Sequence, residues 1–377
     1  MSIDLQGIPI IDHHCHPFFR PDPALEVDHF LKIFTESDSP EILHHHVPHT
    51  LYYRRAMRYL AEFFRCEPTL EDVLEARKQY EEAELLSRLI TDAGIEVLLL
   101  DTGFPPAAYT PGELASLLPC QVGQILRLEK LAGELLPVTA SFAELEQRML
   151  QEVRQFAKAG GMALKSIIAY RSGLGVVAPE PEAVERAFEQ LRRTARGEEV
   201  RITAKPLLDA LLLSVLELNR EVGLPVQFHT GFGDRDIDLL QANPLLLKTL
   251  FQERQFREFP IILLHAGYPY VREAGYLVNT YPNLYVDVSL SIPLIHGRGV
   301  VLFHELLELA PSTKILYASD GHSFPEFHWL GARFVRALLS QVLSEYREAG
   351  VLEEREAYQI GEQILWRNAQ EVYRVSP

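Results

Sequence analysis

Short apolar runs rich in β-branched residues alternate with longer segments of helical periodicity along almost the whole chain. Most of the short runs are continuously apolar, which is typical of strands buried on both faces of a parallel sheet covered by helices. Eight of them are predicted to be strands. They are Ile8–Asp12, Glu96–Asp101, Val122–Leu128, Met162–Ile167, Pro225–Phe228, Ile261–Leu264, Leu284–Val288 and Lys314–Ala318.

Helical segments separate the predicted strands. Ser141 and Glu144 have the spacing of a capping box, which predicts a helix that begins there and runs towards Gly160. Further helices are predicted at Glu75–Asp92, Pro206–Val222 and Pro244–Phe256.

Eight βα units in succession favour the α/β class and a closed (β/α)₈ TIM barrel. A doubly wound open sheet is the alternative architecture. It would need a glycine-rich phosphate-binding loop after the first strand, and this chain has histidines there. We therefore expect residues 1–377 to form a single barrel domain.

Two segments exceed a minimal barrel. Residues 17–90 follow the first predicted strand and contain His44, His45, His46 and His49. An insertion at this point leaves from the C-terminal face of a barrel, where active sites are built, so we predict a helical lid or pocket wall. Residues 326–377 are predicted to form amphipathic helices that close the barrel.

Composition restricts the function classes. The chain has 377 residues, of which 47% are hydrophobic and 23% charged, so an ordinary folded protein is expected. A net charge of −16 argues against nucleic acid or an anionic membrane as a partner. No signal peptide or membrane-spanning run of about 20 apolar residues is evident. We expect a cytoplasmic protein that acts on a small molecule, and a homo-oligomer is compatible with a large barrel.

The first predicted strand ends in the sequence Asp12-His13-His14-Cys15-His16. Alternate side chains of an extended chain share a face, so His14 and His16 point one way while His13 and Cys15 point the other. Two imidazoles on the inner wall of a barrel can bind one metal ion. A histidine-rich surface turn is the alternative interpretation.

Three later strands also run into polar residues. His229 follows the fifth strand, His265 the sixth and Asp320 the eighth. Because these strand ends converge on one mouth of a barrel, the pattern indicates a metal site with imidazole and carboxylate ligands. A catalytic metal lowers the pKa of a bound water towards about 7, and Asp320 is the candidate acceptor of its proton.

Lys165, near the end of the fourth strand, has three open interpretations. It can bind a substrate carboxylate, bridge two metals as a carbamate, or pair with a buried acid. Arg127, Arg171 and Arg20 also lie on the predicted rim, with Tyr170 beside Arg171, and are candidate ligands for an anionic substrate group. Ordinary Arg–Glu pairing at the barrel mouth is the alternative for the arginines.

Together these motifs resemble the amidohydrolase superfamily. The resemblance rests on Asp12–His16, His229, His265 and Tyr317–His322, in that order, and on the closing helix Ile364–Tyr373. The closer resemblance is to the amidohydrolase 2 branch. Within that branch, Lys165–Leu174, Phe228–Asp234 and Tyr317–His322 are similar to the nodulin-type domain that precedes glutamine synthetase in some fusion proteins.

The resemblance implies a barrel with one or two divalent ions, with Zn²⁺ the expected metal and Mn²⁺ the alternative. It implies ligands at His14, His16, His229 and Asp320, and makes His265 either a ligand or a hydrogen-bond donor to the reacting group. Two-metal members place a carbamylated lysine where Lys165 lies, although its flanking sequence differs from that subtype.

The leading hypothesis is a metal-dependent hydrolase of an amide, ester or related bond, with Asp320, His265 and Lys165 as catalytic residues. A metal-dependent decarboxylase or lyase is the rival enzyme class, because the branch contains non-oxidative decarboxylases. A barrel that binds a ligand without turnover is the third hypothesis, since one scaffold hosts many chemistries.

Overall fold

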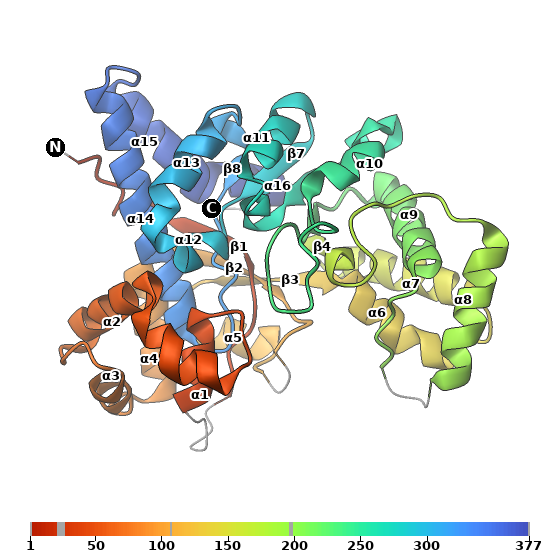
Figure 1. Ribbon diagram of the computed structural model, residues 1–377, viewed down its shortest axis with the longest axis horizontal. Helices are drawn as coiled ribbons and strands as arrows, with labels where there is room; N and C mark the ends of the chain where they lie inside the picture. Colours follow the sequence, from red (N-terminus) through yellow and green to blue (C-terminus); the bar gives the residue numbers. More distant parts are fainter. Residues whose placement is uncertain (1, 21–26, 106–107, 196–198, 376–377) are drawn as a thin grey trace. The chain divides into compact units, whose positions relative to one another are not determined.

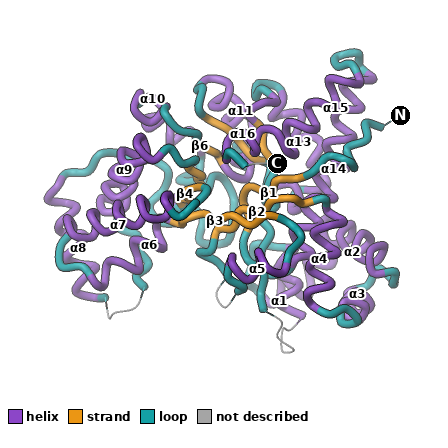
Figure 2. Tube along the Cα trace, turned by 180° about the vertical axis from the view of Figure 1, so that it is seen from behind, coloured by secondary structure: helices purple, strands orange, loops and turns teal. Residues whose placement is uncertain are grey.

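The computed structural model describes residues 2–20, 27–105, 108–195 and 199–375. Eight parallel strands follow one another in chain order, with helices between them, so the predicted (β/α)₈ barrel is confirmed. Figure 2 shows β1 and β2 side by side. The strands are β1 (Ile10–Cys15), β2 (Ile95–Asp101), β3 (Gln121–Arg127), β4 (Ala163–Ser166), β5 (Val226–Phe228), β6 (Ile261–Leu263), β7 (Leu284–Asp287) and β8 (Ile315–Leu316).

The first and last strands differ from their predicted bounds. Strand β1 continues to Cys15 instead of ending at Asp12, because Cys15 still pairs with Leu100 of β2 after an irregularity in the register. His13 and His14 therefore lie within the strand. Strand β8 is reduced to two residues, since the backbone beyond Leu316 makes other hydrogen bonds.

The chain divides into two compact units, and each is described by itself. The first comprises residues 1–123 and 288–377 and contains β1, β2 and β8. Its helices are coloured red to yellow-orange and cyan-blue to blue in Figure 1. They are α1 (Val27–Leu31), α2 (Leu51–Phe64), α3 (Leu70–Arg77), α4 (Glu82–Ala93), α5 (Pro111–Leu117), α12 (Ser291–Leu294), α13 (Gly299–Leu307), α14 (Pro325–Glu348), α15 (Glu354–Glu362) and α16 (Asn368–Tyr373).

The second unit comprises residues 124–287 and contains β4 to β7. These strands pair in parallel from β4 through β7, and all but one of their residues are buried, as the continuous apolar runs predict. The helices of this unit are α6 (Leu128–Leu135), α7 (Phe142–Lys158), α8 (Pro181–Thr194), α9 (Lys205–Val222), α10 (Lys248–Gln252) and α11 (Val271–Thr280).

Two of the predicted helices are interrupted. The segment Glu75–Asp92 is not one helix: α3 ends at Arg77 and α4 begins at Glu82. Tyr80, in the break, packs its ring against Phe64 at 5.7 Å between centroids, which anchors the turn. The segment Pro244–Phe256 forms three short pieces, a 3-10 turn, α10 and a second 3-10 turn, and the extended backbone of Glu253 separates the last two.

One of the two hydrogen bonds of the predicted capping box forms at the start of α7. The Ser141 hydroxyl accepts the backbone N–H of Glu144 as expected. The Glu144 carboxylate, however, accepts the N–H of Ala140 instead of that of Ser141. The helix start is still satisfied, because both side chains bind exposed backbone donors.

The described part of the predicted insertion from residue 27 onward contains helices and packs on the long helix α14 of the same unit, while residues 21–26 lie outside the described residues. The rings of Tyr52 and Tyr59, on α2, lie 5.7 and 5.3 Å from that of Phe334. Its role as a lid stays a prediction.

One buried arginine ties three segments of the first unit together. The Arg336 guanidinium, on α14, donates to the carbonyls of Leu5 and Ile8 at 2.7 Å each and to that of Ala93 at 3.0 Å. Gly94 follows at φ +65°, and a Cβ there would lie 2.8 Å from the guanidinium. A side chain at position 94 would therefore meet both backbone strain and a clash.

Replacing Arg336 by alanine should destabilise the protein by at least about 3 kcal/mol, because three carbonyls lose their donors in a buried place. The urea midpoint and the melting temperature would measure the loss. Arg355→Ala, which removes an exposed arginine from α15, is the matched control. Equal midpoints for the two variants would contradict the assigned role.

Candidate metal centre

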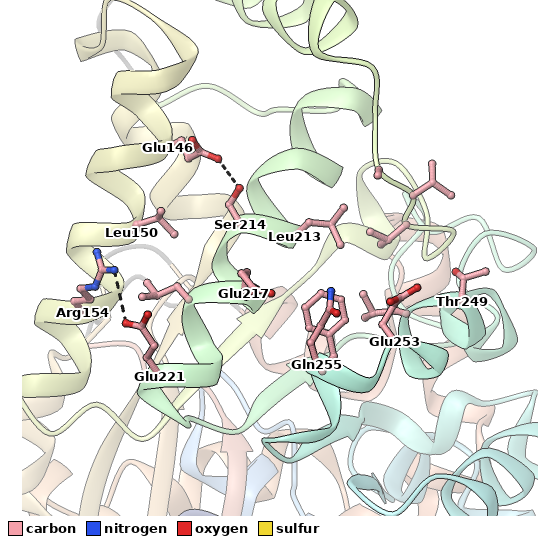
Figure 3. A pocket seen from close by; sticks show the side chains of 16 residues that line it. Glu146, Leu150, Arg154, Leu213, Ser214, Glu217, Glu221, Thr249, Glu253 and Gln255 are labelled. Carbon is pink, nitrogen blue, oxygen red and sulfur yellow. Dashed lines mark hydrogen bonds and ion pairs between the residues drawn. The ribbon is translucent and has the colours of Figure 1, made fainter.

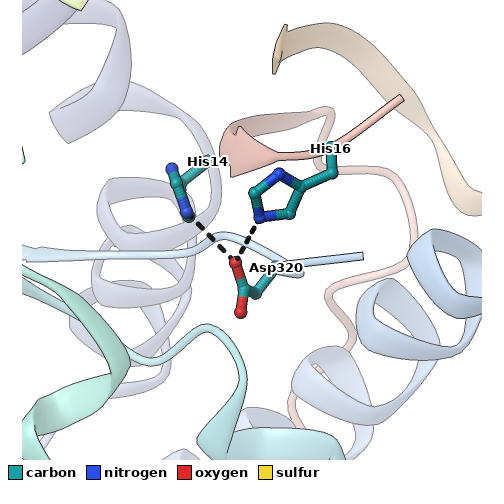
Figure 4. A group of neighbouring side chains, drawn as sticks. All are labelled: His14, His16 and Asp320. Atoms are coloured by element: carbon teal, nitrogen blue, oxygen red, sulfur yellow. Dashed lines mark ion pairs between the residues drawn. The ribbon is translucent and has the colours of Figure 1, made fainter. Parts of the chain in front are cut away.

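Three predicted ligands meet in the first unit. The Nε2 atoms of His14 and His16 lie 3.1 and 3.3 Å from Oδ1 of Asp320. Figure 4 shows the three side chains pointing toward one another from β1 and from the segment after β8. Both histidines are buried, and the aspartate side chain is 13% exposed. Within the described part of the chain this is the one group of three such residues close enough to share an ion.

The distances fit a single metal ion. Zinc binds imidazole nitrogen and carboxylate oxygen at about 2.0–2.2 Å, so neighbouring ligand atoms of a tetrahedral ion are about 3.3–3.6 Å apart. The nitrogen–oxygen separations of this cluster, 3.1 and 3.3 Å, are close to that spacing. His16 Nδ1 lies 3.0 Å from the carbonyl of Asp101, to which it can only donate. This hydrogen bond leaves Nε2 with a free lone pair for a metal.

Backbone hydrogen bonds hold the ligands in register. The N–H of Asp320 donates to His14 O at 3.0 Å, and the N–H of His16 donates to Gly321 O at 2.8 Å. Asp320 itself has φ +53°, a left-handed conformation that costs free energy for most residues. Such a conformation persists only where surrounding contacts impose it.

Asp12 and Ser319 supply those contacts. Asp12 is fully buried and accepts both the N–H of Ser319, at 2.9 Å, and its hydroxyl, at 2.5 Å. The Ser319 oxygen in turn accepts the N–H of Gly321 at 2.8 Å. The network therefore fixes the residues on both sides of Asp320.

Two side chains beside this cluster have no role in the sequence prediction. The ring of Phe104 lies 5.8 Å from that of His16 and 5.5 Å from that of His322. Burial, with His16 nearby, lowers the pKa of His322 to about 4, so this ring is neutral at pH 7. His322 stands two residues after Asp320 in the motif Tyr317–His322, and this position was the signal from which it could have been found. Phe104 lay in a loop with no pattern to single it out.

His328 supports the cluster from α14. Its Nε2 lies 3.2 Å from the carbonyl of His16, and burial lowers the pKa of its ring to about 3. On the opposite face of β1, His13 contacts the Tyr373 hydroxyl at 2.9 Å, and the Cys15 thiol approaches Leu99 O. Burial also raises the pKa of Cys15, which therefore stays a thiol.

Three further predicted residues meet in the second unit. His265 Nε2 lies 2.9 Å from His229 Nδ1, and His229 Nε2 lies 3.1 Å from the carbonyl of Phe232. The Tyr170 ring packs against that of His229 at 4.4 Å. His265 has φ +65°, and its N–H donates to the Asp287 carboxylate at 2.6 Å. The kink turns the His265 ring towards His229.

Lys165 and Arg127 lie in the sheet of this unit. Lys165 is paired in register with Arg127 on β3 and with Gln227 on β5, and it is 2% exposed. Its neighbour Ser166, on the other face of β4, donates to Glu129 of α6 at 2.6 Å. Lys165 therefore points away from α6, which is the inner face of a barrel strand.

The remaining arginines differ in their surroundings. Arg171 is half-buried, and burial together with Arg201 and Arg127 lowers its pKa, while Glu129 and Asp236 oppose that shift, so it has both cations and acids as neighbours. Arg20 donates to Glu113 at 2.7 Å and lies over the Tyr109 ring at 5.1 Å. Its charge is thus shared with an acid of the chain.

The structure brings His14, His16 and Asp320 together in one unit, and His229, His265 and Tyr170 in the other. Arg20 lies in the first unit, and Lys165, Arg127 and Arg171 lie in the second. A cavity of about 830 Å³ in the second unit, drawn in Figure 3, is lined by α7, α9 and α10. It contains none of the predicted site residues.

Residues 131–375 match the protein family described as Amidohydrolase. The chain is also 30% identical over 417 residues to the protein fluG of Emericella nidulans. That alignment covers 99% of this chain and 46% of fluG, so the chain spans about half the length of this curated relative. Among the described residues, every helix is too short or too polar to cross a membrane.

Two solved structures place the fold among known proteins. A candidate metal-dependent hydrolase from Lactobacillus casei ATCC 334 matches with a TM-score of 0.89 and 30% identity, over 99% of this chain and 98% of that one. A uronate isomerase from Thermotoga maritima matches with a TM-score of 0.67 and 12% identity, over 98% and 95% of the two chains. The second likeness concerns the fold alone.

Replacing Ser319 by alanine should weaken metal binding by about tenfold or more, because the Asp12–Ser319–Gly321 network no longer fixes Asp320. Competition with a chromophoric chelator would measure the affinity. Ser116→Ala removes an exposed hydroxyl that donates to the Gly112 carbonyl in the first turn of α5 and is the control. An unchanged affinity in Ser319→Ala would show that the network does not orient the carboxylate.

Proposed function

Because the chain belongs to the amidohydrolase family, we propose that it is a metal-dependent hydrolase that cleaves an amide, ester or related bond of a small anionic substrate. The observation that carries the proposal is the convergence of His14, His16 and Asp320 at 3.1 and 3.3 Å. Zn²⁺ is the proposed metal, since imidazole nitrogen and carboxylate oxygen suit it.

The metal would supply Lewis acidity and lower the pKa of a bound water. His14 and His16 would hold it through their Nε2 lone pairs, with the tautomer of His16 set by the Asp101 carbonyl. Asp320 would also hold it, and the carboxylate would accept the proton of the attacking water and pass it to the leaving group. Phe104 and His322 line the same place and limit the access of bulk water.

His229 and His265 are proposed to act as a pair. If the Nε2–H of His229 donates to the Phe232 carbonyl, its Nδ1 accepts from the Nε2–H of His265. His229 then uses both nitrogens within the protein, so it binds a metal through Nε2 only by releasing Phe232. His265 sets the orientation of the His229 ring in either state.

Arg171, with Arg127 and Lys165, is proposed to hold the anionic part of the substrate. Arg171 is the strongest candidate, because it is half-buried, and burial with its neighbours Arg201 and Arg127 lowers its pKa more than Glu129 and Asp236 raise it. Arg20 is the weakest, since Glu113 already accepts from it. The kinship to a nodulin-type domain and a homo-oligomeric state are further proposals.

Elemental analysis should find about one zinc or manganese ion per purified chain, and the His14→Ala/His16→Ala variant should lose it, because two of its three clustered ligands are gone. The exposed pair His45→Ala/His46→Ala removes the same number of histidines and should retain the metal. About two ions per chain would add Lys165 to the ligand set. No metal, even after reconstitution, would end the proposal.

Asp320→Asn should lower kcat/KM by about 10²- to 10⁴-fold, because the amide cannot accept the proton. Asparagine tolerates the left-handed backbone at position 320, so the fold should persist. The exposed Asp38→Asn is the control. A panel of amides, esters and carboxylic acids would be tested for both hydrolysis and CO₂ release. Release of CO₂ without hydrolysis would assign a decarboxylase instead.

A further inference from the structure

A second cavity lies in the first unit, among residues of α2, α4 and α14. It measures about 460 Å³, within the range of small-molecule sites. Unlike the metal cluster, it is built mainly from aromatic rings and arginines. Its lining residues are Tyr59, Glu62, Phe63, Arg65, Tyr80, Arg88, Asp92, Trp329 and Arg333.

The rings form a fixed apolar wall. Trp329 is 2% exposed, and its indole N–H donates to Asp92 at 2.6 Å, which holds the ring by one edge. The ring of Phe63 lies 5.3 Å from the indole and that of Tyr59 lies 6.5 Å from it. Planar molecules bind such walls by edge and face contacts with the rings.

Cations outnumber acids around this wall. Arg333 lies over the rings of both Tyr59 and Trp329, at 5.3 and 5.5 Å, and Arg88 lies over Tyr80 at 4.9 Å. The lining holds three guanidinium groups and two carboxylates, of which Asp92 already accepts from the indole. The other carboxylate, Glu62, is 71% exposed and lies 3.9 Å from Arg333, so this ion pair is long and open to solvent. Arg88 is paired with Glu84 at 3.2 Å, so Arg65 and Arg333 are the guanidinium groups left for a ligand.

Arg65 adds an uncommitted charge. Within residues 27–105 and the other described ranges, its guanidinium makes no ion pair or hydrogen bond. It also ends α2 with φ +58°, a position at which glycine costs less. An arginine is therefore present where the backbone does not favour one, at the edge of an aromatic cavity in a protein of net charge −16.

We propose that this cavity is a second ligand site, which binds a planar aromatic molecule carrying a carboxylate or phosphate group. The ring of the ligand packs on the half-buried ring of Phe63, which lies against the indole of Trp329, and its oxyanion pairs with Arg65 and Arg333, whose planar forks match either group. The site goes beyond the proposed hydrolase function and does not depend on it. Trp329 directly follows His328 in the chain, and His328 contacts the carbonyl of His16.

Fluorescence of Trp329 tests the site directly. The chain has two tryptophans, so Trp366→Phe leaves Trp329 as the single reporter. Titration with benzoate and with phenyl phosphate should each give a saturable change, and the tighter of the two identifies the preferred oxyanion. Benzyl alcohol lacks the charge, and acetate and inorganic phosphate lack the ring. Each of the three should bind at least about tenfold more weakly.

Substitutions locate the binding. Arg65→Gln and Arg333→Gln should each weaken it about tenfold, whereas Arg58→Gln, which removes an exposed charge from the same helix, should not. Binding should persist in the His14→Ala/His16→Ala background, which separates this cavity from the metal cluster. The proposal is overturned if neither anion saturates by about 10 mM, if the neutral ring binds equally well, or if Arg65→Gln binds like Arg58→Gln.

Discussion

The exchange of backbone hydrogen bonds between β1 and the segment after β8 is the constraint on which the metal centre depends. His14 accepts from Asp320, and His16 donates to Gly321, so the two segments are held in register at the point where the ligands arise. This backbone register already places the side chains of His14, His16 and Asp320 close to one another. Asp12 and Ser319 reinforce the register from beneath, through a fully buried network that water cannot disrupt.

The same segments explain how much of the site the sequence could predict. Strand periodicity and the alternation of side chains were sufficient for His14 and His16, because β geometry places residues i and i+2 on one face. Asp320 followed from its place after the eighth apolar run. Phe104 and His328 could not be found in this way, since a loop residue and a helical histidine reach the cluster only through tertiary packing.

The strands of the fold could be predicted from the sequence, but one break between helices could not. All eight strands were predictable, most of them because buried parallel strands carry a strong apolar signal, although β3 is largely unburied. The break between α3 and α4 was not, since the sequence around Tyr80 keeps a helical pattern and the ring is anchored by Phe64 from α2. The family match also begins only at residue 131, so His14 and His16 rest on geometry rather than on that match.

The left-handed backbone of Asp320 has a consequence for the variation this protein can tolerate. Position 320 must satisfy two independent requirements: a carboxylate for the proposed chemistry, and a residue that accepts positive φ. Glutamate meets the first requirement but not the second, and asparagine or glycine meet the second but not the first. Aspartate alone meets both. Homologues that lose this residue should therefore have abandoned the reaction, so its identity can sort active members of a lineage from those adapted to bind without turnover.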